Sequence, residues 1–168
     1  GKSAFPEDHP LSLGSGGRAT PLGVRRFLDD ADVIFGIGCS FATTGFGVTM
    51  PEDKTFIHAT LDPDDLNKDL EVQHPLVGDA QLVLQALLGE LKGRALQQAA
   101  ARRDTAGKIR RIQESWLSDW MPKLSSDEQP LSPYRVLWDL LHTVNVDETI
   151  ITHDAGSPRD QLSPFWVS

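Results

Sequence analysis

The sequence predicts an α/β fold: a Rossmann-like parallel sheet flanked by helices, then a helical connector, then the first helix and strand of a second α/β domain. Three apolar runs predict the strands of the sheet: "DVIFGIG" at 32–38, "TFIHATL" at 55–61 and "HPLVGD" at 74–79. Helix-start signals follow the second and third runs, so the strands need crossover connections, which make a sheet parallel. The unbroken apolar character of 32–38 predicts a strand buried on both faces.

The first half of the chain also carries the helices of this predicted domain. Residues 1–20 are rich in Gly, Pro and Ser, which is typical of an irregular connection, with one short strand at 11–13. Capping residues followed by apolar positions then predict three helices. These run from Thr20 and Pro21 to near Ala31, onward from Asp62 and Pro63, and from Asp79 to Leu91.

Beyond Gly93 the composition shifts to Ala, Gln, Arg and Glu, which predicts a long exposed helix over 95–120. Trp116 and Trp120 lie one turn apart and are expected to dock the end of that helix. The proline-bearing segment "MPKLSSDEQPLSP" is the best internal boundary. After it we expect a helix opened by Ser132 and Pro133, a buried strand at 149–152, and a turn into a helix that starts at Ser157 and Pro158. The predicted divisions are a partial central domain at 1–93, the helical connector at 94–130, and the start of the second domain at 131–168.

Charge and composition exclude several classes of function. The formal net charge is −8, from 16 Lys and Arg against 24 Asp and Glu, which argues against nucleic acid as a partner. A local basic stretch is interpreted as a solvated helix face; it comprises Arg94, Arg102, Arg103, Lys108, Arg110 and Arg111. Cys39 is the only cysteine, so a reducing compartment is expected. No apolar run approaches the roughly 18 residues of a membrane span, and the expected protein is soluble and cytoplasmic.

Two glycines at the end of the first strand form the first candidate site. Gly36 and Gly38 would let a phosphate or ribose approach the backbone, or would simply turn the chain. The dinucleotide pattern GxGxxG is incomplete because Phe41 occupies its third glycine. Asp62 and Asp79 follow the next strands, where an acid can bind ribose hydroxyls, but each is also a suitable helix N-cap.

The histidines and the cysteine give no catalytic pattern. The five histidines lack the spacing of a metal site, and the chain has no GxSxG motif. His58 alternates within a strand and is interpreted as a packed histidine with satisfied hydrogen bonds. Cys39 is interpreted as a buried structural thiol rather than a nucleophile, because no histidine near it in the sequence forms an obvious partner.

The turn at 154–157 is the second candidate site. A strand, a small-residue turn and a helix start would present free N–H groups and a positive dipole end, which suit a diphosphate. The same residues would also suit an ordinary capped turn.

Several stretches, taken in order, resemble a known family. "GKSAFPEDHPLSLG", "ADVIFGIGCSF", "IHATLDPDDLNKDL" and "HPLVGDAQLVLQALL" are similar to the central domain of thiamine-diphosphate-dependent enzymes of the acetolactate synthase type. The terminal "ITHDAGSPRDQ" resembles the opening strand and turn of that family's diphosphate-binding domain. The resemblance implies FAD, ADP or no nucleotide in the central domain, and thiamine diphosphate with Mg²⁺ in the parent enzyme.

Matched by position, the resemblance implies two sets of contacts. The nucleotide set is Gly36, Gly38, Cys39, Ser40, Thr60, Leu61, Asp62 and Asp79. The thiamine diphosphate set is Ala155, Gly156, Ser157 and Pro158. The chain departs from the family where Thr60 replaces an acid, where Ser40 replaces an arginine, and where Ser157-Pro158 replaces Gln-His. These departures argue against tight FAD binding and favour a related decarboxylase or carboligase.

The resemblance further implies that this chain is a fragment of a larger enzyme. The fragment alone is expected to be inactive, and the parent enzyme is expected to act on a 2-keto acid or related acyl substrate. The family's activating glutamate and its magnesium-binding stretch are not present in it. A homo-oligomer is expected, since unpaired sheet edges favour self-association. The alternative is a nucleotide-binding or purely structural Rossmann-like module. A further option, a free-standing NAD-dependent enzyme, is opposed by the incomplete glycine pattern.

Overall fold

A computed structural model describes residues 4–15, 21–45, 47–93 and 104–167. The chain divides into two compact units, one formed by residues 1–26 with 104–168 and the other by residues 27–103. We call them the helical unit and the sheet unit and describe each by itself. The predicted domain limits at 93 and 130 remain a proposal. The division into two units reflects packing within this chain and does not test those limits.

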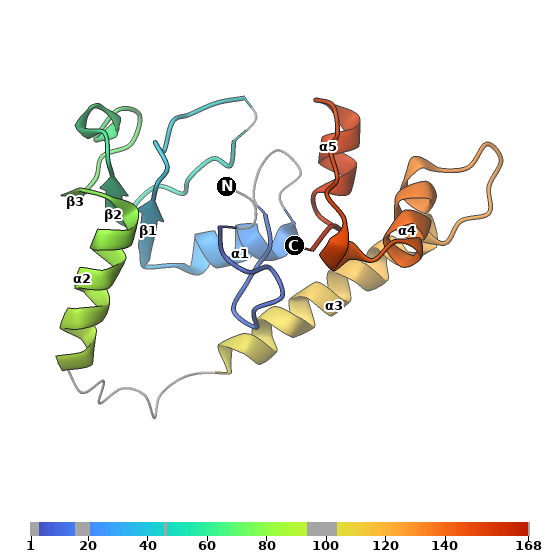
Figure 1. The fold of residues 1–168 in the computed structure, drawn as a ribbon, viewed down its shortest axis with the longest axis horizontal. Helices are drawn as coiled ribbons and strands as arrows, with labels where there is room; N and C mark the ends of the chain where they lie inside the picture. The colour runs from blue at the N-terminus through green and yellow to red at the C-terminus, as the bar shows by residue number, and fades with distance from the viewer. Residues whose placement is uncertain (1–3, 16–20, 46, 94–103, 168) are drawn as a thin grey trace. The chain divides into compact units, whose positions relative to one another are not determined.

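In its described residues the sheet unit contains three parallel strands, as predicted (Figure 1). They are β1 (Val33–Ile37), β2 (Thr55–Thr60) and β3 (His74–Val77), in the spatial order β1-β2-β3. The register pairs Ile37 with Ala59 and Thr60 with Val77, so the three strands end at the same edge of the sheet. The predicted α/β character of this region is therefore confirmed.

Burial is concentrated in the central strand. In β2, Phe56 is 2% exposed and His58 is fully buried, whereas all four residues of β3 are exposed. The prediction that the first strand is buried on both faces is wrong: Val33 is 51% exposed. The reason is that β1 lies at the edge of the described sheet, so an apolar run alone did not reveal which strand is central.

The helices of the sheet unit agree in part with the prediction. Helix α2 (Ala80–Gly93) follows Asp79 as expected and contacts β2. The helix expected after Asp62 is only a 3-10 turn, Pro63–Asp65, which ends at Leu66 in extended backbone. Helix α1 (Leu22–Asp30), whose residues 22–26 belong to the helical unit, also forms where it was predicted. Its expected cap, Thr20, lies outside the described residues.

The helical unit is built around α3 (Thr105–Leu124), which contacts α4 (Pro133–Thr143), which in turn contacts α5 (Ser157–Leu162) (Figure 1). Helix α3 begins at the N-cap Asp104 and runs beyond the predicted end at 120. The predicted helical residues 95–103 lie outside the described part of the chain. Lys108, Arg110 and Arg111 are exposed on α3, which confirms a solvated face for this part of the basic stretch.

Aromatic side chains pack the helical unit. The rings of Trp116 and Phe165 stack with centroids 5.0 Å apart, and Trp120 contacts Tyr134 at 4.9 Å. Trp120 also meets Phe165 edge to face at 5.6 Å. The predicted docking role of the two tryptophans of α3 is therefore confirmed. Leu124, at the end of this helix, is fully buried.

Two predicted strands do not form in the structure. Residues 149–152 are irregular and Ile150 is 94% exposed, because no described strand pairs with this segment and an isolated strand leaves its N–H and C=O groups unbonded. Residues 11–13 are irregular for the same reason. The turn and helix start at Ser157 do form as predicted, with proline in the first turn. Among the described residues, no helix has the length and apolar character that crossing a membrane requires.

Candidate functional site

The nucleotide contacts implied by the sequence converge at one edge of the sheet unit. Parallel register brings the ends of β1, β2 and β3 together, with Gly38 N–H donating to the Ala59 carbonyl at 2.9 Å. In the same way, Gly78 N–H donates to the Thr60 carbonyl at 2.9 Å. The structure therefore brings the predicted residues together. What they can bind depends on which of their polar groups already form hydrogen bonds within the chain.

Gly36 makes room for a protein side chain. It is buried within β1, and a Cβ at this position would overlap the ring of Phe41 and lie 2.9 Å from Cys39 Sγ. Phe41 has a φ of 50°, in the left-handed region that favours glycine. The space left by the absent side chain of Gly36 is thus filled by the Phe41 ring of the same turn.

The three residues after β1 lie closer to solvent. Gly38 has a φ of 62° with open space around its Cα, which explains a glycine here. Cys39 is exposed, so its interpretation as a buried thiol is wrong: the chain has already left the sheet at this residue. The Ser40 hydroxyl accepts a hydrogen bond from Ala42 N–H at 3.3 Å, which closes a local turn.

His58 is packed, as predicted, but only one of its ring nitrogens is bonded. Its Nε2 lies 2.6 Å from the carbonyl oxygen of Cys39. A carbonyl can only accept, so Nε2 is the donor. Nδ1 is buried with no hydrogen-bond partner, so the interpretation of His58 as fully satisfied is wrong. An alternating strand pattern predicts burial but carries no information on ring nitrogens.

The two candidate carboxylates act as caps. Asp62 Oδ1 accepts from Asp64 N–H at 2.9 Å, and Asp79 Oδ1 accepts from Gln81 N–H at 3.0 Å and Leu82 N–H at 3.1 Å. Both capping roles are thereby confirmed, while a ribose contact at either remains a prediction. Thr60 is buried and its hydroxyl accepts from Asp62 N–H at 3.2 Å, whereas Leu61 is 73% exposed.

The second candidate site, at 154–158, is an exposed turn of the helical unit. Gly156 has a φ of 90° and precedes the six-residue helix α5. Ala155 N–H donates to the Asp154 carboxylate at 2.7 Å, so this donor is already used. Ser157 and Pro158 are exposed in the first turn of α5. The carboxylate of Asp154 would repel a diphosphate, which leaves little more than a backbone turn to receive one.

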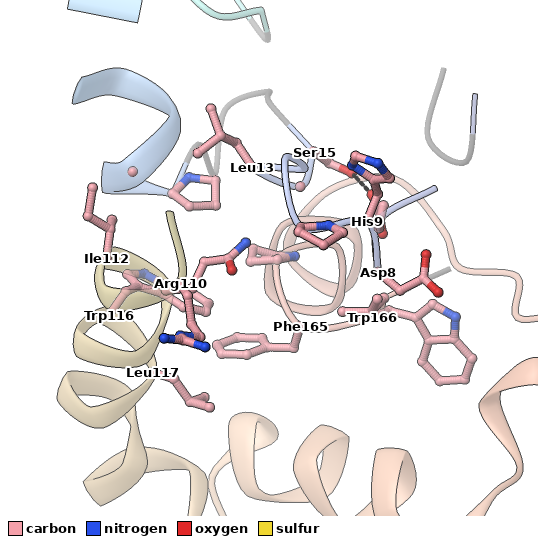
Figure 2. Close-up of a pocket in the computed structure, with 18 of the residues that line it drawn as sticks. Asp8, His9, Leu13, Ser15, Arg110, Ile112, Trp116, Leu117, Phe165 and Trp166 are labelled. Carbon is pink, nitrogen blue, oxygen red and sulfur yellow. Dashed lines mark hydrogen bonds between the residues drawn. The ribbon is translucent and has the colours of Figure 1, made fainter. Parts of the chain in front are cut away.

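The helical unit also contains a cavity that the sequence did not predict. It has a volume of about 960 Å³, and none of the predicted site residues line it. Figure 2 shows His9 and Leu13 from the N-terminal segment, Trp116 from α3, and Phe165 and Trp166 from the segment after α5 around it. The repeated aromatic residues of 116–120 and 165–166 were the available signal. Trp116 and Trp120 were predicted to dock the end of α3, and Trp116 is one of several aromatic residues that line this cavity.

Comparison with known proteins decides the family. The model of "Thiamine pyrophosphate enzyme, central domain" matches residues 1–87. The chain belongs to the thiamine pyrophosphate enzyme family. The resemblance predicted from the sequence is thereby confirmed, and the match spans all three strands of the sheet unit.

Individual relatives extend the similarity beyond the central domain. A probable acetolactate synthase large subunit of Methanocaldococcus jannaschii is 30% identical over 174 residues, which cover 99% of this chain and 28% of that protein. Acetolactate synthase isozyme 3 large subunit of Escherichia coli is 28% identical over 159 residues, covering 93% of this chain and 27% of that protein. A probable sulfoacetaldehyde acetyltransferase of Rhizobium meliloti is 26% identical, covering 92% and 29%. The chain thus spans less than a third of the length of these curated relatives.

In the described part of this thiamine pyrophosphate enzyme chain, the turn predicted to contact thiamine diphosphate offers few polar groups. No group of three His, Cys, Asp or Glu side chains in the described part could hold a metal ion. The turn at 154–158 offers Gly156 and the Ser157 hydroxyl, beside the acidic Asp154.

Proposed function

We propose that this chain is a segment of a thiamine-diphosphate-dependent decarboxylase or carboligase of the acetolactate synthase type, which acts on a 2-keto acid or a related acyl substrate. The observation that carries the proposal is similarity along 99% of the chain to a probable acetolactate synthase large subunit, past the central domain matched at 1–87. Thiamine diphosphate, when bound, supplies a carbanion that attacks a carbonyl, and Mg²⁺ would hold its diphosphate.

Within such an enzyme, this chain would contribute a scaffold and one turn of the cofactor site. The turn from Ala155 to Pro158 would approach the diphosphate through its backbone, since Gly156 adopts a φ of 90° that other residues rarely reach. The segment 149–152 would have to pair with a neighbouring strand to present this turn. The sheet unit would act as the central domain.

The chain alone is proposed to be inactive. In its described residues no three-membered cluster of acidic, His or Cys side chains is positioned for a metal ion, and the turn at 154–158 is exposed. The test is to incubate the purified 168-residue chain with thiamine diphosphate, Mg²⁺ and pyruvate and to measure CO₂ release. We expect none above the rate without protein, and measurable decarboxylation would refute inactivity.

A segment exchange tests the enzymatic role directly. The matching segment of the Methanocaldococcus jannaschii protein is replaced by this chain, and product formation from pyruvate is measured. We expect activity in the exchanged protein and its loss in the same protein carrying Gly156→Val, because valine cannot readily adopt the conformation of this turn. A folded exchanged protein with the size of the original but no activity would contradict the proposal.

The alternative function is a purely structural Rossmann-like module. It is supported by the capping of helix starts by Asp62 and Asp79, which accounts for both carboxylates without a ligand. Titration with ADP and FAD distinguishes a structural module from a nucleotide-binding one. Saturable binding that is lost in Asp62→Ala supports a nucleotide site, and no binding supports a scaffold.

Self-association is proposed as well. Strands β1 and β3 each have only one partner among the described residues, and unpaired edges bind further strands. Light scattering at rising concentration is expected to show a homo-oligomer. A monomer throughout would contradict this.

A further inference from the structure

We infer that Phe41 closes the turn after β1 to nucleotides, so that this central domain excludes the FAD or ADP that some relatives of the family hold. In a dinucleotide-binding turn, the glycines bring the backbone close to the pyrophosphate. Here the space above Gly36 is filled from within the chain, since a Cβ at Gly36 would overlap the Phe41 ring. The glycine serves the packing of Phe41.

The Phe41 ring is held in place by two buried residues of β2. It meets Phe56 edge to face with centroids 5.6 Å apart, and His58 in the same manner at 4.9 Å. Phe56 is 2% exposed and His58 is fully buried, so both are fixed by the core. His58 also donates to the Cys39 carbonyl two residues before Phe41. Displacing the ring would therefore cost contacts on both sides.

The rest of the turn also lacks what a pyrophosphate needs. In Rossmann folds the pyrophosphate lies at the N-terminus of the helix that follows the glycines. Residues 38–45 and 47–54 contain no helix. Several N–H groups of this loop are already bonded: Gly38 to the Ala59 carbonyl, Ala42 to the Ser40 hydroxyl and Thr43 to the Asp69 carboxylate at 2.7 Å. The bound carboxylate adds a negative charge that repels phosphate.

This inference goes beyond the proposed function and does not depend on it. The segment exchange measures catalysis at the diphosphate turn, whereas nucleotide exclusion concerns the edge of the sheet unit. Nucleotide binding by the unaltered chain would overturn the inference and leave the enzymatic proposal intact. An inactive exchanged protein would contradict the enzymatic proposal and leave the inference on nucleotide exclusion intact.

The test follows the amide resonances of Gly36 and Gly38 in the full, ¹⁵N-labelled chain during titration with ADP and with FAD. In the unaltered chain we expect no saturable shift up to about 1 mM nucleotide, a concentration that would detect binding of only ~4 kcal/mol. Phe41→Gly removes the ring, suits the left-handed φ and completes the pattern GxGxxG. In this variant we expect weak but saturable shifts at Gly36 and Gly38, with an apparent Kd of about 1 mM, because the bonded N–H groups and the Asp69 carboxylate remain.

Phe41→Leu is the matched control, because it keeps an apolar side chain over Gly36 and should remain closed. If Phe41→Gly loses the amide dispersion of a folded protein, Phe41→Ala takes its place. Saturable shifts at Gly36 and Gly38 in the unaltered chain would overturn the inference. The absence of any gain in a folded Phe41→Gly or Phe41→Ala variant would overturn the role of Phe41.

Discussion

Nε2 of His58 donates a hydrogen bond of 2.6 Å to the main-chain oxygen of Cys39 and thereby ties the turn after β1 to the central strand. His58 is fully buried and its ring also packs against Phe41. We therefore expect His58→Ala to destabilise the sheet unit by about 2–3 kcal/mol, from the lost packing and the unbonded carbonyl. Amide hydrogen exchange in β2 would then be about 100-fold faster, at 1.36 kcal/mol per factor of ten.

His74→Ala is the control for this variant, because His74 belongs to the same sheet but is exposed in β3. An exposed substitution is expected to change stability by less than ~0.5 kcal/mol. His58→Gln should recover part of the loss, since its side-chain amide can donate to the Cys39 carbonyl. Equal exchange rates in β2 for His58→Ala and the unaltered chain would show that the bond is not stabilising.

Asp79 stabilises the start of α2 through two accepted hydrogen bonds, from Gln81 and Leu82 N–H. Replacing an N-cap Asp with Ala removes the acceptor and costs about 1 kcal/mol. We expect Asp79→Ala to speed amide exchange in the first turn of α2 by about fivefold. Asp79→Asn keeps the acceptor and should exchange at the original rate. An identical acceleration in the Asn variant would instead assign the effect to the lost charge.

The sequence predicted the local features of the sheet unit well, because each depends on neighbouring residues. The parallel strands, the start of α2 at Asp79 and the capping role of Asp62 follow from apolar runs and cap residues. Which strand is central depends on the number of neighbours in space. For that reason the sequence predicted burial for β1, although Val33 is 51% exposed.

The sequence predicted the position of the candidate site but not the contacts that its residues make within the chain. Parallel topology brought Gly36 and Asp62 to one edge, as expected. The sequence showed that Phe41 breaks the GxGxxG pattern, but not that its ring lies over Gly36. Nor could the pattern at 149–152 predict a strand reliably, because strand formation requires a partner in space and none is present among the described residues.

Phe165 joins the aromatic side chains of α3 and α4 and is expected to stabilise the helical unit. Its ring stacks on Trp116 at 5.0 Å and meets Trp120 at 5.6 Å. Because Phe165 is only partly buried, Phe165→Ala should cost about 2 kcal/mol. All four tryptophans belong to the helical unit, so their fluorescence during urea unfolding reports this unit alone; they are Trp116, Trp120, Trp138 and Trp166.

Phe5→Ala provides the comparison within the same unit. Because Phe5 is 54% exposed, this variant should lower the free energy of unfolding by less than ~0.5 kcal/mol. If Phe165→Ala unfolded at the same urea concentration as Phe5→Ala, the aromatic cluster would not contribute to stability.

Arg135 binds the segment after α3 to helix α4, and its contribution is expected to be independent of pH near neutrality. Its guanidinium donates to Asp127 at 2.6 Å, to Asp139 at 2.8 Å and to the Ser126 carbonyl at 3.2 Å. The hydrogen bond to Asp127, followed by that to Asp139, raises the pKa of Arg135 above its ordinary value. A raised pKa gives stability that is present below the unfolded-state pKa and lost only as the pH rises through the folded-state pKa.

We therefore expect Arg135→Met to lower the urea midpoint of tryptophan fluorescence by the same amount at about pH 6 and pH 9, because arginine stays charged and carboxylates stay ionised throughout this window. High salt should reduce the difference, since the ion pairs are partly exposed to solvent. Arg110→Met is the control: Arg110 pairs with Glu114 at 3.9 Å and both side chains are largely exposed, so the midpoint should hardly change. If the urea midpoints of Arg135→Met and the unaltered chain differed at one of these pH values but not at the other, a group other than the guanidinium would control this contact.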